Sequence, residues 1–217
     1  MRVIAGSCRS MPLICPKGEG TRPTTDRIKE TLFNILQCDV PGSVFVDLFA
    51  GSGSIAIEAL SRGAKYAYIV DNSKEAIECI KQNVNFTKLS DRATIIARSA
   101  IDSLYEINVP ADIIFMDPPY GADVEEDVLA ALSHARCLTE DTLIIIEADI
   151  NKDFDFVTGL GYEVTREKCY KTNKHVFIRR SQEEKKKKKK QYIREASIRL
   201  HMDIWILSKE APKLLMN

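Results

Sequence analysis

The stretch SVFVDLFAGSGSIA, residues 43–56, joins an apolar run to a helical pattern through a turn that contains two glycines. The run 43–49 predicts a buried strand, and a helix is expected from about Ser54 to Arg62. A strand that enters a helix through a short glycine turn is the first part of a βαβ unit. This part of the sequence therefore favours a parallel sheet that is covered by helices.

The same alternation continues on both sides of the glycine turn. Further apolar runs predict strands at 66–71, 93–97, 112–117 and 142–147, and helices are expected over about 22–36, 73–85 and 124–135. Apolar strands that alternate with helices predict an α/β fold with both faces of the sheet covered. The segments YEVTREKCY and KHVFIRR flank the turn KTN (171–173), which predicts an antiparallel hairpin that closes the sheet.

Composition divides the chain of 217 residues near Arg180, because all the glycines precede this point and a run of lysines (185–190) follows it. We expect an N-terminal extension over 1–40, a main domain over 41–180 and a lysine-rich tail over 181–217. Their net charges are +2, −7 and +5. A nucleic acid should therefore meet the ends of the chain rather than its acidic centre, although ordinary surface charge accounts for these counts equally well.

The remaining composition is typical of a globular protein, with 45% hydrophobic and 29% charged residues. No apolar run approaches the roughly 18 residues of a membrane span, and the first residues lack the apolar core of a signal peptide. The six cysteines show no CxxC spacing, so we expect reduced thiols rather than a metal site or a disulfide framework. We therefore expect a cytoplasmic protein without membrane or metal partners, and a monomer by default.

The glycine turn has the features of a cofactor site. Gly51, Gly53 and Ala56 fit the pattern G-x-G-x-x-A, and Asp71, about 20 residues further on, can accept hydrogen bonds from both hydroxyls of a ribose. Asp47 would repel a pyrophosphate but suits a ligand with an ammonium or sulfonium group. No GK[ST] sequence follows to hold a phosphate. S-adenosylmethionine therefore fits this turn better than NAD, and a tight turn with nothing bound is the structural alternative.

The strand expected at 112–117 leads into Asp117-Pro118-Pro119-Tyr120. A residue before proline is extended and proline lacks an N–H, so the Pro118 carbonyl can point into a cleft beside the Asp117 carboxylate. Two such acceptors match the two N–H bonds of a planar exocyclic amine, and the carboxylate stabilises the positive charge that develops on nitrogen during attack. Tyr120 offers an aromatic face for a base that has left its helix. We interpret these residues as catalytic rather than as a simple turn.

At these residues the sequence resembles the bacterial RsmD family, the 16S rRNA (guanine(966)-N2)-methyltransferases, which belong to the S-adenosylmethionine-dependent seven-stranded methyltransferases. The resemblance runs from Met1 to about Arg180. It rests on MRVIAG (1–6), RPTTDRIKETLFNIL (22–36), DLFAGSGSIAIEALSRGA (47–64) and MDPPY (116–120). MDPPY is shared with amino-methylating enzymes generally, whereas the N-terminal stretch and the form of the glycine loop are particular to this family.

The resemblance implies a Rossmann-like seven-stranded sheet with a C-terminal antiparallel hairpin and a short N-terminal extension. It also implies S-adenosylmethionine-dependent methylation of the N2 amine of one guanine in 16S rRNA, within the small ribosomal subunit or an assembly intermediate. The residues expected to bind the cofactor are Asp47, Phe49, Gly51, Gly53, Asp71 and Ser99. Those expected to hold the target base are Asp117, Pro118 and Tyr120. Those expected to face RNA are Arg2, Arg9, Arg22, Thr24, Arg27 and Lys29.

Two features depart from the family pattern. Ser99 stands after the third strand, where such enzymes usually have an acid for the adenine amine, so either Ser99 or Asp102 is expected to supply the acceptor. The lysine-rich tail matches nothing in the family. It is either an RNA-binding extension or the product of a shifted reading frame in an adenine-rich tract. We favour the second, because its apolar segment has no evident partner.

Two other functions stay open. Adenine-N6 methylation of DNA or RNA uses the same amine geometry, although the chain lacks room for a separate DNA-reading domain. The second alternative is a non-catalytic assembly protein with a nucleotide-binding fold, which only the serine at position 99 supports. Binding of S-adenosylmethionine separates both enzymes from the assembly protein.

Overall fold

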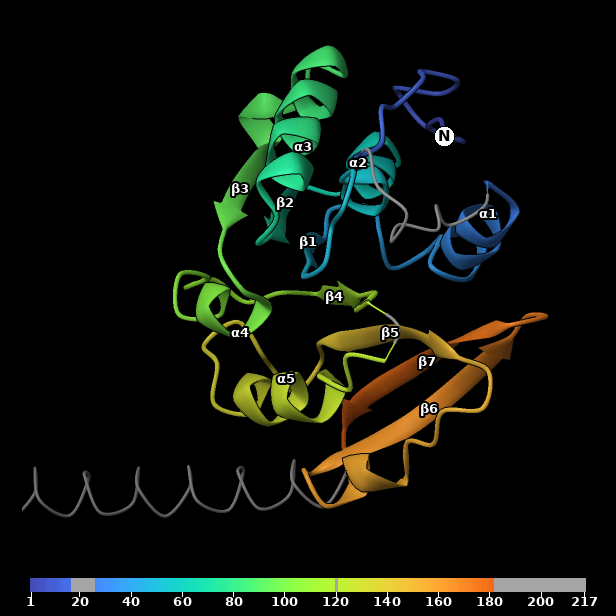
Figure 1. Ribbon diagram of the computed structural model, residues 1–217, viewed down its shortest axis with the longest axis vertical. Helices are drawn as coiled ribbons and strands as arrows, with labels where there is room; N and C mark the ends of the chain where they lie inside the picture. The colour runs from blue at the N-terminus through green and yellow to red at the C-terminus, as the bar shows by residue number, and fades with distance from the viewer. Residues whose placement is uncertain (17–25, 120, 182–217) are drawn as a thin grey trace, which may run out of the picture. The chain divides into compact units, whose positions relative to one another are not determined.

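The computed structural model describes residues 1–16, 26–119 and 121–181. Met1–Arg179 forms one compact unit, and a second unit begins at Arg180. The strands form one seven-stranded sheet in the order β3-β2-β1-β4-β5-β7-β6 (Figure 1). Strands β1 to β5 pair in parallel, and β7 runs antiparallel to β5. The expected α/β fold, with a seven-stranded sheet and a C-terminal antiparallel hairpin, is therefore confirmed.

The strands lie close to their predicted positions. They are β1 (Val44–Asp47), β2 (Tyr66–Asp71), β3 (Ala93–Ala97), β4 (Ile113–Met116), β5 (Leu143–Asp149), β6 (Tyr162–Cys169) and β7 (Asn173–Arg180). β2 and β3 have the predicted bounds, because their apolar runs coincide with the paired residues. β5 extends to Asp149, beyond the predicted end at 147, because β7 pairs with it as far as that residue.

The helices are α1 (Asp26–Ile35), α2 (Ser54–Ser61), α3 (Lys74–Phe86), α4 (Ala100–Ser103) and α5 (Glu125–Leu132), with 3-10 turns η1 (Ser90–Arg92) and η2 (Asp155–Thr158). Ser73 caps α3, since its hydroxyl accepts the N–H of Ala76 at 3.3 Å. The sequence pattern did not predict α4, because four residues are too few for a helical repeat. Residues 22–25 of the predicted first helix lie outside the described residues.

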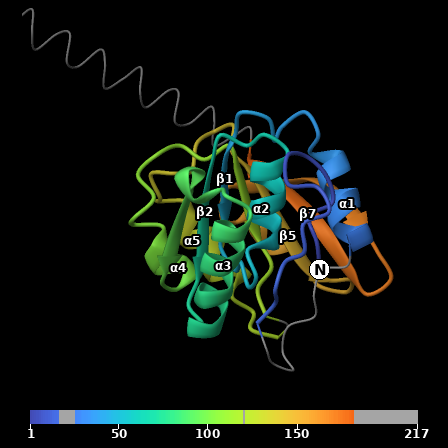
Figure 2. The ribbon, with the colours of Figure 1, turned by 90° about the horizontal axis from the view of Figure 1, so that it is seen from above.

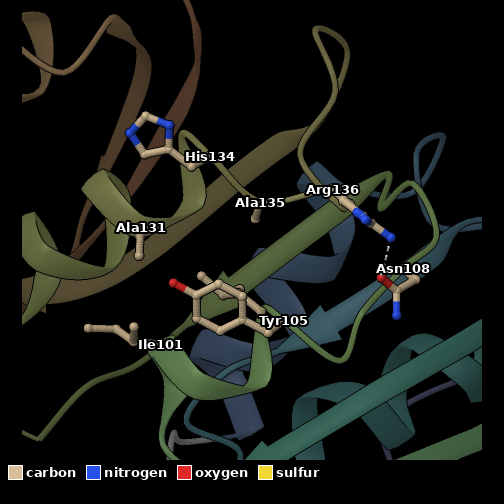
Figure 3. A pocket seen from close by; sticks show the side chains of 8 residues that line it. Ile101, Tyr105, Asn108, Ala131, His134, Ala135 and Arg136 are labelled. Carbon is tan, nitrogen blue, oxygen red and sulfur yellow. Dashed lines mark hydrogen bonds between the residues drawn. The ribbon is translucent and has the colours of Figure 1, made fainter.

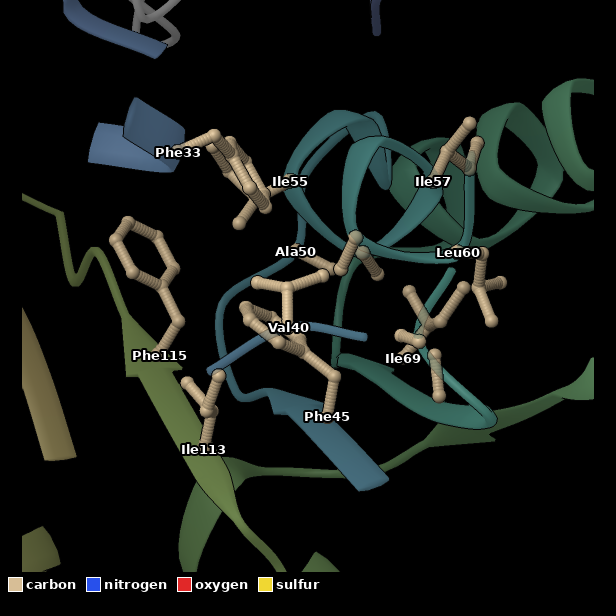
Figure 4. Packing of buried hydrophobic residues seen from close by; sticks show 14 of the residues in the cluster. Phe33, Val40, Phe45, Ala50, Ile55, Ile57, Leu60, Ile69, Ile113 and Phe115 are labelled. Atoms are coloured by element: carbon tan, nitrogen blue, oxygen red, sulfur yellow. The ribbon is translucent and has the colours of Figure 1, made fainter. Parts of the chain in front are cut away.

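Helices cover both faces of the sheet, as Figure 1 shows. One apolar cluster joins α1, α2 and α3 to strand residues such as Phe45 and Phe115 (Figure 4). The other joins α4 and α5 to strand residues such as Val46 and Ile114. In Figure 2, α1, α2 and α3 lie across the front of the strands. Because side chains alternate between the two faces of a strand, Asp47 projects to the same face as Phe45.

The N-terminal segment 1–16 is hydrogen-bonded to two buried polar side chains of α2. The carboxylate of Glu58 accepts the N–H groups of Ile4 and Ala5 at 2.8 and 3.0 Å. The hydroxyl of Ser61 accepts the N–H of Cys8 at 2.9 Å and donates to the carbonyl of Ala5 at 2.6 Å. The extension therefore packs on the sheet domain rather than forming a separate body.

All six cysteines lie within the described residues and are free thiols. None of the described helices has the length and apolarity that a membrane crossing requires. Within the same part of the chain, no group of three or more His, Cys, Asp or Glu side chains is arranged to hold a metal ion.

Candidate active site

Four acidic residues meet at the carboxyl ends of the parallel strands. Asp47 ends β1, Asp71 ends β2, Asp117 directly follows β4, and Glu147 lies near the end of β5. The register aligns these ends, since Asp47 pairs with Phe115 of β4. In open α/β sheets ligands bind at this edge. The structure therefore brings together three of the acids that the sequence pattern selected and adds Glu147, which the pattern did not select.

Asp71 holds the glycine loop in place. One oxygen of its carboxylate accepts the N–H of Gly51 at 2.8 Å, and the other accepts the N–H of Ser73 at 2.9 Å. Gly51 and Gly53 have φ values of +55° and +74°, which residues other than glycine rarely adopt. A Cβ on Gly53 would lie 3.4 Å from Ile80, whereas one on Gly51 would meet no described atom within 4 Å. The Gly51 side of the loop therefore faces open space, which suits a bound ligand.

Asp47 lies under this loop and is almost fully buried, with 1% of its surface exposed. Its Oδ2 accepts the N–H of Ala56 at 3.3 Å, while Oδ1 is buried without a hydrogen-bond partner among the described residues. Burial raises the pKa of Asp47 to about 7, and the charge of Asp71 acts in the same direction. A buried acceptor without a partner is costly. The site therefore fits a ligand that brings a positive group or a donor to Asp47, as S-adenosylmethionine does.

Asp117 is partly exposed, Pro118 is buried and Pro119 is exposed. Tyr120 lies outside the described residues, so the predicted stacking face has no structural description. Burial raises the pKa of Asp117 well above its usual range, and the negative charges of Glu147 and Asp47 raise it further. Asp117 is therefore a stronger proton acceptor than an ordinary aspartate.

A buried polar chain extends from Glu147 into the C-terminal hairpin. Nδ2 of Asn173 donates to Oε1 of Glu147 at 2.5 Å, and Nε2 of His175 lies 3.1 Å from Oε2. Nδ1 of His175 lies 3.1 Å from the hydroxyl of Tyr170. Burial raises the pKa of Tyr170 to about 12, and the charge of Glu147 acts in the same direction. The sequence contains one signal for this chain, a glutamate at the end of an otherwise apolar strand, TLIIIE (142–147).

The predicted adenine contact involves two residues that the structure brings together. Ser99 caps α4, since its hydroxyl accepts the N–H of Asp102 at 3.1 Å and donates to Oδ2 of Asp102 at 2.7 Å. Phe49 is half-buried and packs against the apolar cluster beneath α4 and α5. Ser99 and Asp102 therefore form one polar unit at the end of β3.

The residues expected to face RNA divide into three groups. Arg2, Arg9 and Arg27 are exposed, and Nε of Arg2 forms an ion pair with Asp26 at 3.1 Å. Arg22 and Thr24 lie outside the described residues. Lys29 is buried and forms the third group.

The prediction that Lys29 faces RNA is wrong. Its side chain is fully buried, and Nζ donates to the carbonyl of Arg2 at 2.7 Å and lies 3.4 Å from Oε2 of Glu58. Lys29 lies on the apolar side of α1, next to Leu32 and Phe33. A buried ammonium is tolerated there because a carboxylate and a backbone carbonyl compensate for the lost water.

A cavity of about 380 Å³ lies between α4 and α5, on the other face of the sheet (Figure 3). Its lining includes Ile101, Leu104, Tyr105 and Ala131, and an Arg136 to Asn108 hydrogen bond of 3.3 Å lies at its side. None of the predicted site residues lines it. The candidate active site is therefore the carboxyl edge of β1, β2, β4 and β5 rather than this cavity.

Comparisons with known proteins agree with the fold. The family model described as "Conserved hypothetical protein 95" matches residues 1–194, so the match extends beyond Arg180. Ribosomal RNA small subunit methyltransferase D of Haemophilus influenzae is 37% identical over 171 residues, covering 77% of this chain and 88% of the relative. The Escherichia coli protein of the same name is 32% identical over 168 residues, covering 77% and 84%. The solved structure of yhhF from Escherichia coli is 29% identical, with a TM-score of 0.72, and the alignment covers 83% of this chain and 98% of that one.

Because the family model matches most of the length of the chain, the chain belongs to the Conserved hypothetical protein 95 family, the RsmD family that its motifs resemble.

Proposed function

We propose that this protein transfers a methyl group from S-adenosylmethionine to the exocyclic N2 amine of a guanine in 16S rRNA, at a position of the guanine 966 type. The observation that carries the proposal is the placement of Asp117 at the same sheet edge as Asp47 and Asp71. The names of the curated relatives support ribosomal RNA of the small subunit as the substrate class.

The glycine loop would hold the cofactor. Asp71, already oriented by two backbone N–H groups, has further lone pairs for the ribose hydroxyls. Oδ1 of Asp47 is the buried acceptor that a positive group of the cofactor would satisfy. We assign the adenine amine to the Ser99 and Asp102 unit, and contact with the cofactor to Phe49, Gly51 and Gly53. Bound there, S-adenosylmethionine supplies the methyl group on a cationic sulfur.

The target amine would lie at Asp117. A carboxylate oxygen of Asp117 and the carbonyl of Pro118 accept the two N–H bonds, which orients the nitrogen lone pair towards the methyl group. Tyr120, two residues after Pro118, would stack on the base. Because the sulfonium is already a good leaving group, alignment provides much of the rate enhancement.

The N-terminal segment and the start of α1 would meet the RNA. Arg2, Arg9 and Arg27 are exposed there, and the main domain is acidic, so within the described residues we assign the phosphate contacts to this segment. We extend the assignment to Arg22 and Thr24 from the family motif. A monomer with so few RNA-reading elements fits a substrate whose base is presented by a small subunit or an assembly intermediate.

The experiment is methyl transfer from labelled S-adenosylmethionine to small ribosomal subunits from cells that lack this gene. We expect one labelled nucleotide, an N2-methylguanine, and a rate of labelling at least about 100-fold lower with Asp117→Ala. Labelled N6-methyladenine would assign the site to the other amine-methylating class. The proposal would be overturned if neither the small subunits nor naked 16S rRNA became labelled and the protein did not bind the cofactor.

A further inference from the structure

Glu147 stands beside Asp117 on the same face of the sheet. Met116 pairs with Ile146 in the parallel β4 and β5 pair, so the next residues on the two strands, Asp117 and Glu147, lie opposite each other. Side chains at paired positions project to the same face. Asp47 of β1 projects to that face as well, since it pairs with Phe115. Acids from three adjacent strands therefore line one end of the sheet.

The position of Glu147 is determined by the antiparallel strand β7. Glu147 pairs with His175, and its two carboxylate oxygens contact Asn173 and His175. Because a carboxylate only accepts, Nε2 of His175 must carry the hydrogen. His175 is fully buried, and its ring lies edge-on to Phe115, with centroids 6.1 Å apart. Phe115 comes two residues before Asp117, so the ring that holds Glu147 also packs against the strand that leads into Asp117.

This arrangement is more than the hairpin needs for stability. A buried carboxylate at position 147 raises the cost of ionising Asp117, and an apolar residue in this place would avoid that cost. Among the described residues, the charged groups that act on Asp117 are Glu147 of β5 and Asp47 of β1. Glu147 itself is faced by Asn173 and His175 of β7, and His175 in turn by Tyr170.

We propose that Glu147 is a positioning residue for methyl transfer: held by Asn173 and His175, its fixed negative charge makes Asp117 the acceptor of the proton that the target amine loses. This inference rests on the proposed function. The nitrogen–carbon bond forms as the carbon–sulfur bond breaks, and the electron pair of that bond stays on sulfur. The nitrogen–hydrogen bond then breaks, its electron pair stays on nitrogen, and the proton moves to Asp117, from which it returns to solvent.

The chemical reason is the strength of the acceptor. An aspartate in water has a pKa near 4 and accepts a proton poorly at neutral pH. General bases are most effective when their pKa lies near the working pH. Burial and the neighbouring charges raise the pKa of Asp117 in this direction. Asp117 then both orients the amine and removes its proton, and Glu147 contributes to the second task through charge rather than contact with substrate.

The test measures the titration of the Asp117 carboxyl by carbon-13 NMR in the protein without ligands, so it does not depend on the methyl transfer assay. Glu147→Gln keeps the shape and an acceptor for Asn173 but removes the charge, and it should lower the Asp117 midpoint by about one pH unit or more. Asp149→Asn, which neutralises an exposed carboxylate on the same strand, should leave the midpoint unchanged. Glu147→Asp, which keeps the charge at a greater distance, should give an intermediate midpoint and serves as the test if Glu147→Gln does not fold.

Kinetics supply the second measurement. In a plot of kcat against pH, Glu147→Gln should move the rise on the acidic side to lower pH and should lower the plateau value of kcat. The affinity for the cofactor should stay unchanged. The contrary result is that the unmodified protein methylates guanine while Glu147→Gln changes neither the titration midpoint of Asp117 nor the acidic side of the pH profile of kcat. In that case Glu147 is structural and this inference is wrong. If the unmodified protein transfers no methyl group, the proposed function fails, whatever the titration gives.

Discussion

The ammonium of Lys29 lies 3.4 Å from Oε2 of Glu58, and neither side chain is exposed to solvent. Lys29 also donates to the carbonyl of Arg2, and Glu58 accepts the N–H groups of Ile4 and Ala5. Burial lowers the pKa of Lys29, while the charge of Glu58 opposes that shift. The pair therefore joins α1, α2 and the N-terminal segment at one buried point.

Lys29→Ala should destabilise the protein by about 3 kcal/mol, because it removes one partner of a buried ion pair. This loss of stability lies at the low end of such values, because Glu58 keeps a second cationic partner in the variant: Nε of Arg62 lies 2.8 Å from its other oxygen, Oε1. Urea unfolding measures it. Arg27→Ala, an exposed change in the same helix, is the control and should alter stability by about 0.5 kcal/mol or less. Equal losses for the two variants would show that the pair contributes nothing.

Asp71→Asn should weaken S-adenosylmethionine binding about 10- to 100-fold, measured by calorimetry. The amide removes acceptor capacity for the ribose and disturbs the carboxylate that holds the N–H groups of Gly51 and Ser73. Asp91→Asn, at an exposed position in η1, is the matched control and should bind normally. Normal affinity in Asp71→Asn would remove this residue from the cofactor site.

Cofactor affinity should depend on pH through Asp47. Because its pKa in the free protein is about 7, Asp47 is largely protonated below that pH, and a positive ligand must displace the proton. Affinity should therefore fall about tenfold for each pH unit below 7 and level off above it. Calorimetry in buffers of different ionisation enthalpy should detect about one proton released at pH 6. Asp47→Asn should bind weakly at all pH values, and an unchanged slope in this variant would place the titration elsewhere.

The same pKa predicts a stability effect in the ligand-free protein. A buried aspartate with a raised pKa keeps its proton in the folded state when the unfolded chain has lost it. Its contribution to stability is therefore greatest below about pH 4 and decreases as pH rises to about 7, by up to about 1.4 kcal/mol per pH unit. Unfolding curves for the unmodified protein and Asp47→Asn over this window measure the difference. A difference that does not change with pH would contradict the raised pKa.

Asp117→Ala should lower kcat by about 100-fold or more and leave cofactor affinity roughly intact, because the residue acts on the amine rather than on the cofactor. Single-turnover methyl transfer and calorimetry separate the two effects. Asp112→Ala is not a suitable control, since its carboxylate accepts the N–H of Val44 at 2.7 Å. Asp127→Ala, at an exposed position in α5, serves instead and should leave both quantities unchanged. A large loss of cofactor binding with normal turnover would count against the assigned role.

Charge reversal at Arg9 or Arg27 should weaken RNA binding and reduce its dependence on salt, because each variant removes the cation that pairs with a phosphate. Filter binding over a range of salt concentrations provides the slope, which should fall by about one for each cation removed. Lys65→Glu, an exposed charge reversal directly before β2, is the control for the change in net charge. If the deficit of the arginine variants is the same at every salt concentration, the two side chains are structural.

Much of the fold follows from local patterns. The runs 66–71 and 93–97 became β2 and β3 with the predicted bounds, because the residues that pair in the sheet are those of the two runs. Asp71 and Asp117 were selected because they follow such runs, and parallel strands place their carboxyl ends at one edge. The four-residue α4 escaped prediction, since it is too short for a helical repeat to show in the sequence.

Lys29 and Glu147 show where local patterns end. A lysine near the start of a helix and a glutamate at a strand end have the same spacing whether they face water or the interior. Their burial depends on groups far away in the sequence: Glu58 and the carbonyl of Arg2 for Lys29, and Asn173 and His175 for Glu147. A charge leaves water only where packing supplies its partners, so the tertiary structure alone decided the buried pair and the carboxylate beside Asp117.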